Sequence, residues 1–330
     1  MSEHILITGV TGFVGSHMAE YLFESRPGAK LFATKRWHLS RMDNVRHIAD
    51  RLTFIDCDLT DPVSTRTAIE KATPDRIFHF AAESFVSPSW ENPHRYMAVN
   101  YNGTLNILEA MRQTGSKARL LIPGSGEEYG QIEEHELPIR DTTVLRPVNP
   151  YAVTKVAQDL IGYVYHASYG LDVVRTRAFN HEGPRREKVF GIPWYAYQIA
   201  LAEAGLAGKE LRVGHIDDRR NFTHVKDMVA AYGLASEKLP AGEMFLIGSE
   251  DEASVHTFRE ALEALIAMST VKGITYRIDP EFVRPTQVPR LIADTGPFRA
   301  LTGWEPRLSY EQILSDTLAY WRERVANGSH

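Results

Sequence analysis

The sequence predicts an α/β fold in which a doubly wound parallel sheet is followed by a smaller α/β lobe. In the first half, short apolar or β-branched runs alternate with longer amphipathic stretches, a pattern typical of βαβ units. In the second half this alternation loosens, and loops marked by Pro and Gly become frequent. We therefore expect a first domain over 1–176 and a second over 177–330, with some later segments returning to the first domain.

The elements follow from their periodicity. Short apolar runs predict strands at 4–8, 30–34, 52–56, 76–80, 118–123 and 171–176. Amphipathic stretches predict helices between them at 14–25, 62–72, 94–114 and 152–169, and later helices near 192–206, 225–237, 254–268 and 309–326. In the helix at 94–114, one face carries apolar residues spaced by three or four, namely Met97, Tyr101, Leu105, Leu108 and Met111.

Composition excludes several classes of protein. The 330 residues include 37 Lys and Arg against 42 Asp and Glu, and 43% are hydrophobic, which excludes a disordered or collagen-like chain. The net charge of −5 argues against broad nucleic-acid binding. No apolar segment reaches the roughly 18 residues of a membrane span, and the single Cys57 can form no intramolecular disulfide. We expect a cytoplasmic protein with a small-molecule partner.

A glycine-rich turn follows the first strand. Ile5-Leu-Ile-Thr runs into Gly9-x-x-Gly12-x-x-Gly15 and then into a helix. In this order, backbone N–H groups and the amino end of the helix can face a pyrophosphate. The alternative is a tight turn without a ligand. We predict a Rossmann-type dinucleotide-binding domain, with a glycine spacing one residue longer than the common Gly-x-Gly-x-x-Gly.

The residues after the second and third strands bear on the choice of dinucleotide. Thr34-Lys35-Arg36 occupies the place where an acidic residue would bind the ribose 2′-hydroxyl of NAD. Because cations attract a 2′-phosphate, NADP is favoured over NAD, although a solvated charged loop explains the same pattern. Asp58 and Leu59 are candidates for contact with the adenine, and a helix cap explains Asp58 equally well.

Tyr151 and Lys155 open a predicted helix, and a separation of four residues places them on one face. An ammonium about 4 Å from a phenol oxygen is worth about 4 kcal/mol at an effective dielectric near 20, or about 3 pKa units. We therefore expect Lys155 to bring the pKa of Tyr151 from about 10 toward neutrality, where the phenol can exchange a proton with a sugar hydroxyl.

Together these motifs resemble those of the extended short-chain dehydrogenases/reductases that act on nucleotide sugars. The resemblance covers most of the chain and rests on the glycine turn, Asp58-Leu59, His79-Phe-Ala81-Ala82, Asn100, Ser125 and Tyr151-x-x-x-Lys155. Three later segments are similar to GDP-mannose 4,6-dehydratases and GDP-4-keto-6-deoxymannose reductases: Phe179-Asn180-His181-Glu182-x-Pro184-Arg185-Arg186, Arg220-x-Phe-x-His-x-Lys-Asp227 and Arg284-Pro285-x-x-Val288.

The resemblance implies an NADP-dependent enzyme with a nucleotide-diphosphate sugar as substrate and no metal. It places the cofactor against Gly9, Gly12, Phe13, Val14, Gly15, Lys35, Arg36, Asp58, Leu59, Ala81, Ala82, Tyr151 and Lys155. It places the substrate against Ser84, Asn180, Arg185, Arg186, Trp194, Arg220, Arg284 and Gln287. Guanidinium groups suit a diphosphate, whereas solvated loops or surface ion pairs are the alternative for these arginines. A homodimer or homotetramer, paired through the helices at 94–114 and 152–169, is also implied.

Glu127 bears on the reaction, because it falls on the acid/base position of the dehydratases it resembles. The implied reaction is a 4,6-dehydration in which Tyr151, with Lys155 and Ser125, takes the O4 proton during transient oxidation at C4. Glu127 then removes the C5 proton, water leaves C6, and the hydride returns to C6. The sequence leaves open whether Glu127 or Glu128 faces the site.

Other reactions stay open. Reduction of a 4-keto sugar needs only Tyr151, some of the reductases also carry an acidic residue at the position of Glu127, and Phe13-Val14 in the glycine turn is more reductase-like. A nucleotide-sugar epimerase and a non-catalytic NADP-binding regulator are further alternatives. Two positions depart from the dehydratases: Trp194 lies in a segment where they carry a base-binding Lys, and Gln287 stands where they have Glu. UDP, CDP or dTDP in place of GDP, and a heptose in place of a hexose, therefore also stay open.

Overall fold

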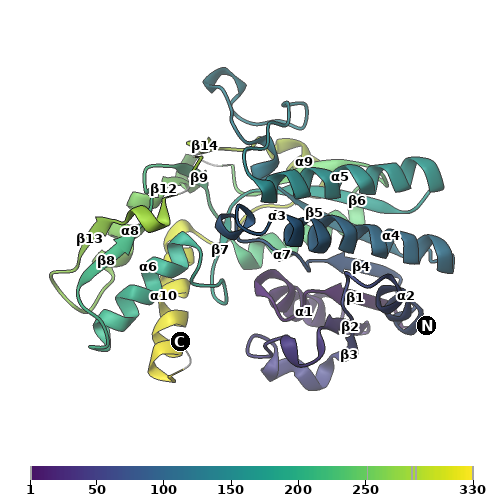
Figure 1. The fold of residues 1–330 in the computed structure, drawn as a ribbon, viewed down its shortest axis with the longest axis horizontal. Coiled ribbons are helices and arrows are strands. Elements are labelled where there is room, and N and C mark those ends of the chain that lie inside the picture. The colour runs from purple at the N-terminus through teal and green to yellow at the C-terminus, as the bar shows by residue number, and fades with distance from the viewer. Residues whose placement is uncertain (1, 251, 284, 287, 329–330) are drawn as a thin grey trace.

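A seven-stranded parallel sheet, in the order β11-β6-β5-β4-β1-β2-β3, forms the centre of the computed structural model. The structure describes residues 2–250, 252–283, 285–286 and 288–328 (Figure 1). The order reverses direction between β1 and β4, the switch point at which such sheets bind ligands beyond the carboxyl ends of their strands. The strands are β1 (His4–Thr8), β2 (Lys30–Lys35), β3 (Thr53–Asp56), β4 (Arg76–His79), β5 (Arg119–Ser125), β6 (Val173–Ala178) and β11 (Met244–Ile247).

Helices cover both faces of this sheet. On one face, α1 and α7 contribute Met18, Leu22, Met228 and Tyr232 to the core. On the other, α2, α4 and α5 contribute Ile69, Ile107, Met111 and Tyr165. The doubly wound fold predicted from the sequence is thus confirmed. The helices of this unit are α1 (Phe13–Ser25), α2 (Pro62–Ala72), α3 (Pro93–Tyr96), the π-helical segment η4 (Met97–Asn102), α4 (Gly103–Thr114), α5 (Pro150–Tyr169) and α7 (Val225–Lys238).

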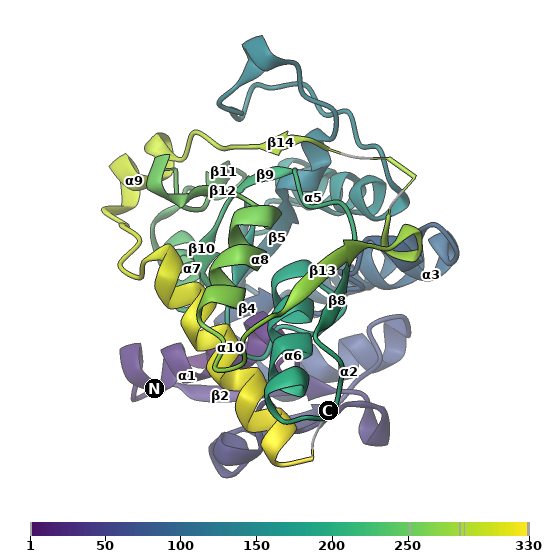
Figure 2. The ribbon, with the colours of Figure 1, turned by 90° about the vertical axis from the view of Figure 1, so that its left-hand side faces the viewer.

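A second lobe is built on α6, α8 and α10, and Figure 2 shows it facing the viewer. Its core includes Ile199, Leu262, Leu314 and Trp321. Its elements are α6 (Gly191–Glu203), α8 (Phe258–Ala267), α10 (Tyr310–Ala326) and the parallel pair β8 (Glu210–Val213) and β13 (Thr275–Ile278). Between the lobes lie the pair β7 (His181–Glu182) and β10 (Thr223–His224) and the sheet of β9 (Arg219–Asn221), β12 (Val255–Thr257) and β14 (Arg290–Leu291).

Some segments of the second half pack on the first core. Met228 from α7 and Phe298 from α9 (Gly296–Thr302) lie in that core together with Trp304, and β11 joins the edge of the main sheet. We propose a division near residue 176 in which α7, β11 and α9 belong to the first unit. In the described part of the chain, no helix is long and apolar enough to cross a membrane.

The strands and helices expected in the first half are all present, with ends that differ by at most a few residues. The sequence did not predict β11 or the short strands β7 to β10 and β12 to β14, because runs of two to four residues show no alternation. The connecting segments contain short 3₁₀ helices, namely η1 (Trp37–Leu39), η2 (Arg46–Arg51), η3 (Ser87–Ser89), η5 (Gly126–Tyr129), η6 (Glu134–Glu136), η7 (Glu252–Ser254) and η8 (Pro280–Phe282).

Candidate active site

The glycine turn packs backbone against backbone at the switch point of the sheet. Gly9 has φ +70°, and a Cβ there would lie 2.6 Å from the backbone nitrogen of Ala81. A Cβ on Gly15 would lie 2.2 Å from the carbonyl oxygen of Gly9. Gly12 is the N-cap of α1 and makes no side-chain capping bond, so the first N–H groups of the helix can bind an anion. The turn therefore fits the pyrophosphate of a dinucleotide.

A side chain at Gly15 is expected to close this turn. In a Gly15→Ala variant the new methyl group must displace the Gly9 carbonyl, so we expect dinucleotide affinity to fall at least about tenfold while the fold is retained. Fluorescence titration with NADPH measures the affinity. Gly28→Ala is the matched control, because a Cβ at Gly28 meets nothing within 4 Å. Equal affinity in the Gly15→Ala and Gly28→Ala variants would contradict this function of the turn.

At the expected adenosine end, the predicted residues differ in what they contact. The ammonium of Lys35 pairs with Asp56 across the ends of β2 and β3, whereas Arg36 is exposed directly after β2. Asp58 accepts hydrogen bonds from the backbone nitrogen and hydroxyl of Thr60, at 2.9 and 2.8 Å. A local turn thus accounts for Asp58, and Arg36 is the more accessible cation for a 2′-phosphate.

The other predicted cofactor residues surround the turn. Phe13 and Val14 lie in the first turn of α1, and the ring of Phe13 stacks on His181 with centroids 5.8 Å apart. Ala81 and Ala82 follow β4, the neighbour of β1. Leu59 is buried in the core beneath α2 and α4.

Tyr151 lies in the first turn of α5, whose N-cap Asn149 accepts a hydrogen bond from the backbone nitrogen of Ala152 at 2.8 Å. The phenol is buried, and burial raises its pKa above the usual value. The charge of Glu127 raises the pKa further, whereas a hydrogen bond with Ser125 lowers it. Ser125 and Tyr151 are therefore brought together, as the resemblance implies.

The ammonium of Lys155 donates hydrogen bonds to acceptors other than the phenol of Tyr151. It donates to the carbonyl oxygen of Pro123 at 2.5 Å and to Oε1 of Gln158 at 2.6 Å. Burial lowers the pKa of Lys155 to about 8. Lys155 is not among the main influences on the pKa of Tyr151, which is raised. The prediction that Lys155 brings this phenol toward neutrality is wrong for this structure, because burial outweighs the cations nearby.

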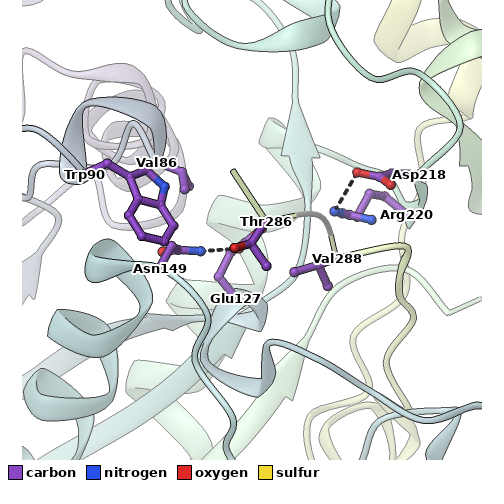
Figure 3. A pocket seen from close by; sticks show the side chains of 8 residues that line it. All are labelled: Val86, Trp90, Glu127, Asn149, Asp218, Arg220, Thr286 and Val288. Atoms are coloured by element: carbon purple, nitrogen blue, oxygen red, sulfur yellow. Dashed lines mark hydrogen bonds and ion pairs between the residues drawn. The ribbon is translucent and has the colours of Figure 1, made fainter. Parts of the chain in front are cut away.

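The structure resolves which of two neighbouring carboxylates faces the site. Glu127 lines a pocket, where its carboxylate accepts a hydrogen bond from the Nδ2 of Asn149 at 3.1 Å (Figure 3). Glu128 is buried on the other side of η5, accepting from the backbone nitrogen of Ser125 at 2.7 Å and pairing with Arg177 at 2.9 Å. Burial raises the pKa of Glu128. Glu127 is thus the carboxylate that can reach a ligand.

The pocket lies between the two lobes. Arg220 on β9 is buried at its side, 3.6 Å from the carboxylate of Asp218 (Figure 3). The lining residues that the sequence analysis missed are Val86, Trp90, Asn149, Asp218 and Thr286, whereas Val288 belongs to the Arg284-Pro285-x-x-Val288 segment named there. A signal existed for Asn149, since an Asn directly before Pro at the start of a helix is a typical N-cap. The others reach the pocket through tertiary structure alone.

Two arginines predicted to bind the substrate, Arg185 and Arg186, are not among the residues that line the pocket. Arg186 stacks on the ring of Phe190, 4.0 Å from its centroid, and its charge lowers the pKa of Tyr151, so it lies near the phenol. Arg185 instead pairs with Glu20 on α1 at 2.6 Å and does not line the pocket.

The other residues predicted to bind the substrate lie in different parts of the structure. The indole N–H of Trp194 donates to the carbonyl of Arg212 at 2.7 Å, and its ring packs on Phe282, so Trp194 supports the second lobe. Asn180 follows β6 and accepts from the backbone of Thr223 through its carbonyl, and Ser84 is exposed after β4. Arg284 and Gln287 lie outside the described residues. Within the described ranges, no three His, Cys, Asp or Glu residues are placed to hold a metal ion.

Comparison with known proteins gives consistent matches along the chain. The family model "GDP-mannose 4,6 dehydratase" matches residues 6–317. The chain is 31% identical over 326 residues to GDP-6-deoxy-D-mannose reductase of Pseudomonas aeruginosa, covering 98% of this chain and 99% of that protein. It is 30% identical over 349 residues to GDP-mannose 4,6-dehydratase of Yersinia enterocolitica, covering 95% of this chain and 92% of that protein.

Solved structures show the same architecture. The structure of RMD from Pseudomonas aeruginosa complexed with NADPH aligns with a TM-score of 0.83 at 29% identity, covering 98% of this chain and all 100% of that chain. UDP-glucose 4-epimerase of Thermus thermophilus in complex with NAD aligns with a TM-score of 0.83 at 28% identity, covering 96% of this chain and 98% of that chain.

Proposed function

Since the chain belongs to the GDP-mannose 4,6-dehydratase family of extended short-chain dehydrogenases/reductases and is an enzyme acting on nucleotide sugars, we propose that it dehydrates GDP-mannose to GDP-4-keto-6-deoxymannose. Its cofactor is NADP, the dinucleotide whose reduced form is bound in the similar structure of RMD. The observation that carries the proposal is the position of Glu127, whose carboxylate lies in the pocket while that of Glu128 is buried. Removal of a C5 proton needs such a base, whereas simple reduction needs none.

The chain's own residues supply binding and proton transfer. When bound, NADP supplies reversible hydride transfer. The glycine turn and the amino end of α1 hold its pyrophosphate. Tyr151, oriented by Ser125, takes the proton from O4 as C4 becomes a ketone. The ketone makes the C5 proton acidic, so Glu127 removes it and then protonates the departing C6 hydroxyl to form water. The hydride held by the bound cofactor would then return to C6, and C5 would take up one proton, which balances the proton that Tyr151 removed from O4.

Reduction of GDP-4-keto-6-deoxymannose is the second candidate. The identity of 31% to a GDP-6-deoxy-D-mannose reductase over 99% of that protein favours it. In this reaction Tyr151 donates a proton to O4, and Glu127 has no required part. The two candidates therefore share Tyr151 and differ in the need for Glu127.

A product assay separates the two candidates. We expect incubation with GDP-mannose and a catalytic amount of NADP+ to give a product lighter by one water, with no net formation of NADPH, as measured by mass spectrometry and absorbance. Stoichiometric oxidation of NADPH with GDP-4-keto-6-deoxymannose, and no reaction with GDP-mannose, would overturn the dehydratase in favour of the reductase. UDP, CDP and dTDP hexoses in the same assay identify the nucleotide.

We further propose a cytoplasmic homodimer paired through α4 and α5. The support for pairing is an apolar surface on α5 that the described part of the chain leaves half exposed, comprising Val153, Leu160, Tyr163 and Val164, each between 45% and 49% exposed. Apolar side chains gathered on one face of a helix favour contact with a second copy. The single buried Cys57 agrees with a reducing compartment.

A further inference from the structure

Gln158 lies one turn after Lys155 on α5, and both side chains are buried. The amide oxygen of Gln158 accepts a hydrogen bond from the Lys155 ammonium at 2.6 Å. Because an ammonium has donors only, the oxygen of this amide must face Lys155 and its NH₂ group must face away. Together with the carbonyl of Pro123, Gln158 thus uses two of the three N–H bonds of the ammonium and sets its direction.

The NH₂ group of Gln158 continues into a buried chain of hydrogen bonds. It donates to the hydroxyl of Thr104 at 2.7 Å, and this hydroxyl donates to the carbonyl of Asn100 at 2.7 Å. His79 Nε2 lies 2.9 Å from the same hydroxyl. Since the hydroxyl has only one proton, His79 must donate to it, and the proton of the imidazole is on Nε2.

The chain ends at the glycine turn. Nδ1 of His79, left as an acceptor, lies 2.8 Å from the hydroxyl of Thr8. That hydroxyl accepts from the backbone nitrogen of Ala81 at 3.2 Å. Burial lowers the pKa of His79 to about 3, so the imidazole is neutral near pH 7, as the chain requires. Every hydrogen bond between Lys155 and the strand end before Gly9 therefore has a consistent donor and acceptor.

Few charged groups compete with Gln158 for the ammonium. Glu128 of η5 and Asp159 of α5 raise the pKa of Lys155, against the effect of burial. Both carboxylates also form ion pairs with Arg177 of β6, which reduces their attraction for Lys155. The other titratable groups of this region are the neutral His79 of β4 and Tyr151 of α5. Gln158 is thus an uncharged acceptor that contacts the ammonium directly.

We propose that Gln158 is the positioning residue of Lys155: its amide oxygen holds the ammonium and favours its charged form, and the chain through Thr104 and His79 ties that position to the glycine turn. The kinetic consequence rests on the proposed function, in either of its two forms. The effect on the protonation of Lys155 does not.

Two substitutions at one position test the proposal. Gln158→Met has a similar length but no acceptor, so the charged form of Lys155 loses a hydrogen bond. Gln158→Glu retains an acceptor and adds a negative charge. With ¹³C-labelled lysine, NMR follows the titration of Lys155, assigned by its loss in Lys155→Arg. We expect the midpoint to move below that of the wild type in Gln158→Met and above it in Gln158→Glu.

Kinetics provide the second measurement. In Gln158→Met we expect kcat to fall about tenfold with KM for the nucleotide sugar little changed, and the alkaline limb of the kcat profile to move to lower pH with the titration of Lys155. Thr317→Val is the control for lost stability, because it removes a buried hydroxyl of α10 that donates to Ile313 at 2.7 Å. It is expected to leave the titration and kcat unchanged.

The outcomes separate the positioning role from the proposed function. An unchanged Lys155 titration in both Gln158 variants overturns the positioning role, even if the enzyme is active. A shifted titration in a protein that neither binds NADPH nor converts a nucleotide sugar supports the positioning role and overturns the proposed function. If Gln158→Met does not fold, the Lys155 titration in Gln158→Glu decides: a midpoint above that of the wild type supports the positioning role, and an unchanged or lower midpoint overturns it.

Discussion

Tyr151→Phe is expected to abolish turnover, by at least about a thousandfold, while NADPH still binds. Both candidate reactions need proton exchange at O4, and general acid–base catalysis by a positioned group contributes up to about ten-thousandfold. Phe keeps the ring, which packs edge-on against Tyr96 with centroids 6.4 Å apart, so the fold is retained. Steady-state rates with GDP-mannose and with its 4-keto-6-deoxy product, together with NADPH fluorescence, measure the two effects.

The matched control for this change is Tyr169→Phe. Tyr169 lies on the same helix, but at its carboxyl end, where it is 56% exposed, so loss of its hydroxyl should leave the rate unchanged. A Tyr151→Phe enzyme with a tenth of the wild-type rate or more would show that another group transfers the O4 proton, and the assignment of Tyr151 would fail.

The environment of Tyr151 favours one protonation state. Burial raises the pKa of the phenol, so the group is protonated near pH 7 and is ready to donate a proton to O4. To accept a proton from O4, the phenol needs positive charge close by. Arg186 is the cation that lowers its pKa in this structure. In this protonated form the phenol can donate a proton directly, whereas it must first lose its own proton before it can accept one from O4.

The first unit of the fold was predictable because its signals are local. Gly9, Gly12 and Gly15 lie between a strand and a helix whose residues are adjacent in sequence, so the strand-turn-helix pattern can be read from a short segment. One such local signal was overlooked. Ser125 and Glu128 are three residues apart, the spacing of a capping box, and both halves of that box form in η5. This spacing predicts that the carboxylate of Glu128 accepts a hydrogen bond from the backbone nitrogen of Ser125. Glu127 is then the carboxylate that is available to line the pocket.

The remainder of the site depends on tertiary structure. The spacing of Tyr151 and Lys155 predicts a shared helix face, but it contains no information on burial or on the Pro123 carbonyl, which lies on another element and binds the ammonium. In the same way, Asp218 and Thr286 reach the pocket from segments far from Glu127 in sequence. Spacing along the chain therefore predicted the shared helix face of Tyr151 and Lys155, but neither their hydrogen-bond partners nor their protonation.

Glu127→Gln is expected to separate the two steps of a dehydration. The amide retains an oxygen that can accept the hydrogen bond from Asn149, which holds Glu127 at 3.1 Å, so the side chain should stay in place. It loses the basicity needed to remove the C5 proton. We therefore expect water loss from GDP-mannose to slow by at least about a hundredfold, while oxidation at C4 continues and NADPH accumulates in amounts comparable to the enzyme.

Single-turnover absorbance and mass spectrometry measure these two steps in the same sample. Glu134→Gln is the control, because Glu134 is 84% exposed in η6 and its ion pair with Arg290 lies outside the pocket residues; this variant should dehydrate at the wild-type rate. A Glu127→Gln enzyme that still loses water at near the wild-type rate would remove the base assignment. If the same variant instead reduces the 4-keto sugar at an undiminished rate and the wild type never dehydrates, the pocket carboxylate is a binding group and the enzyme is a reductase.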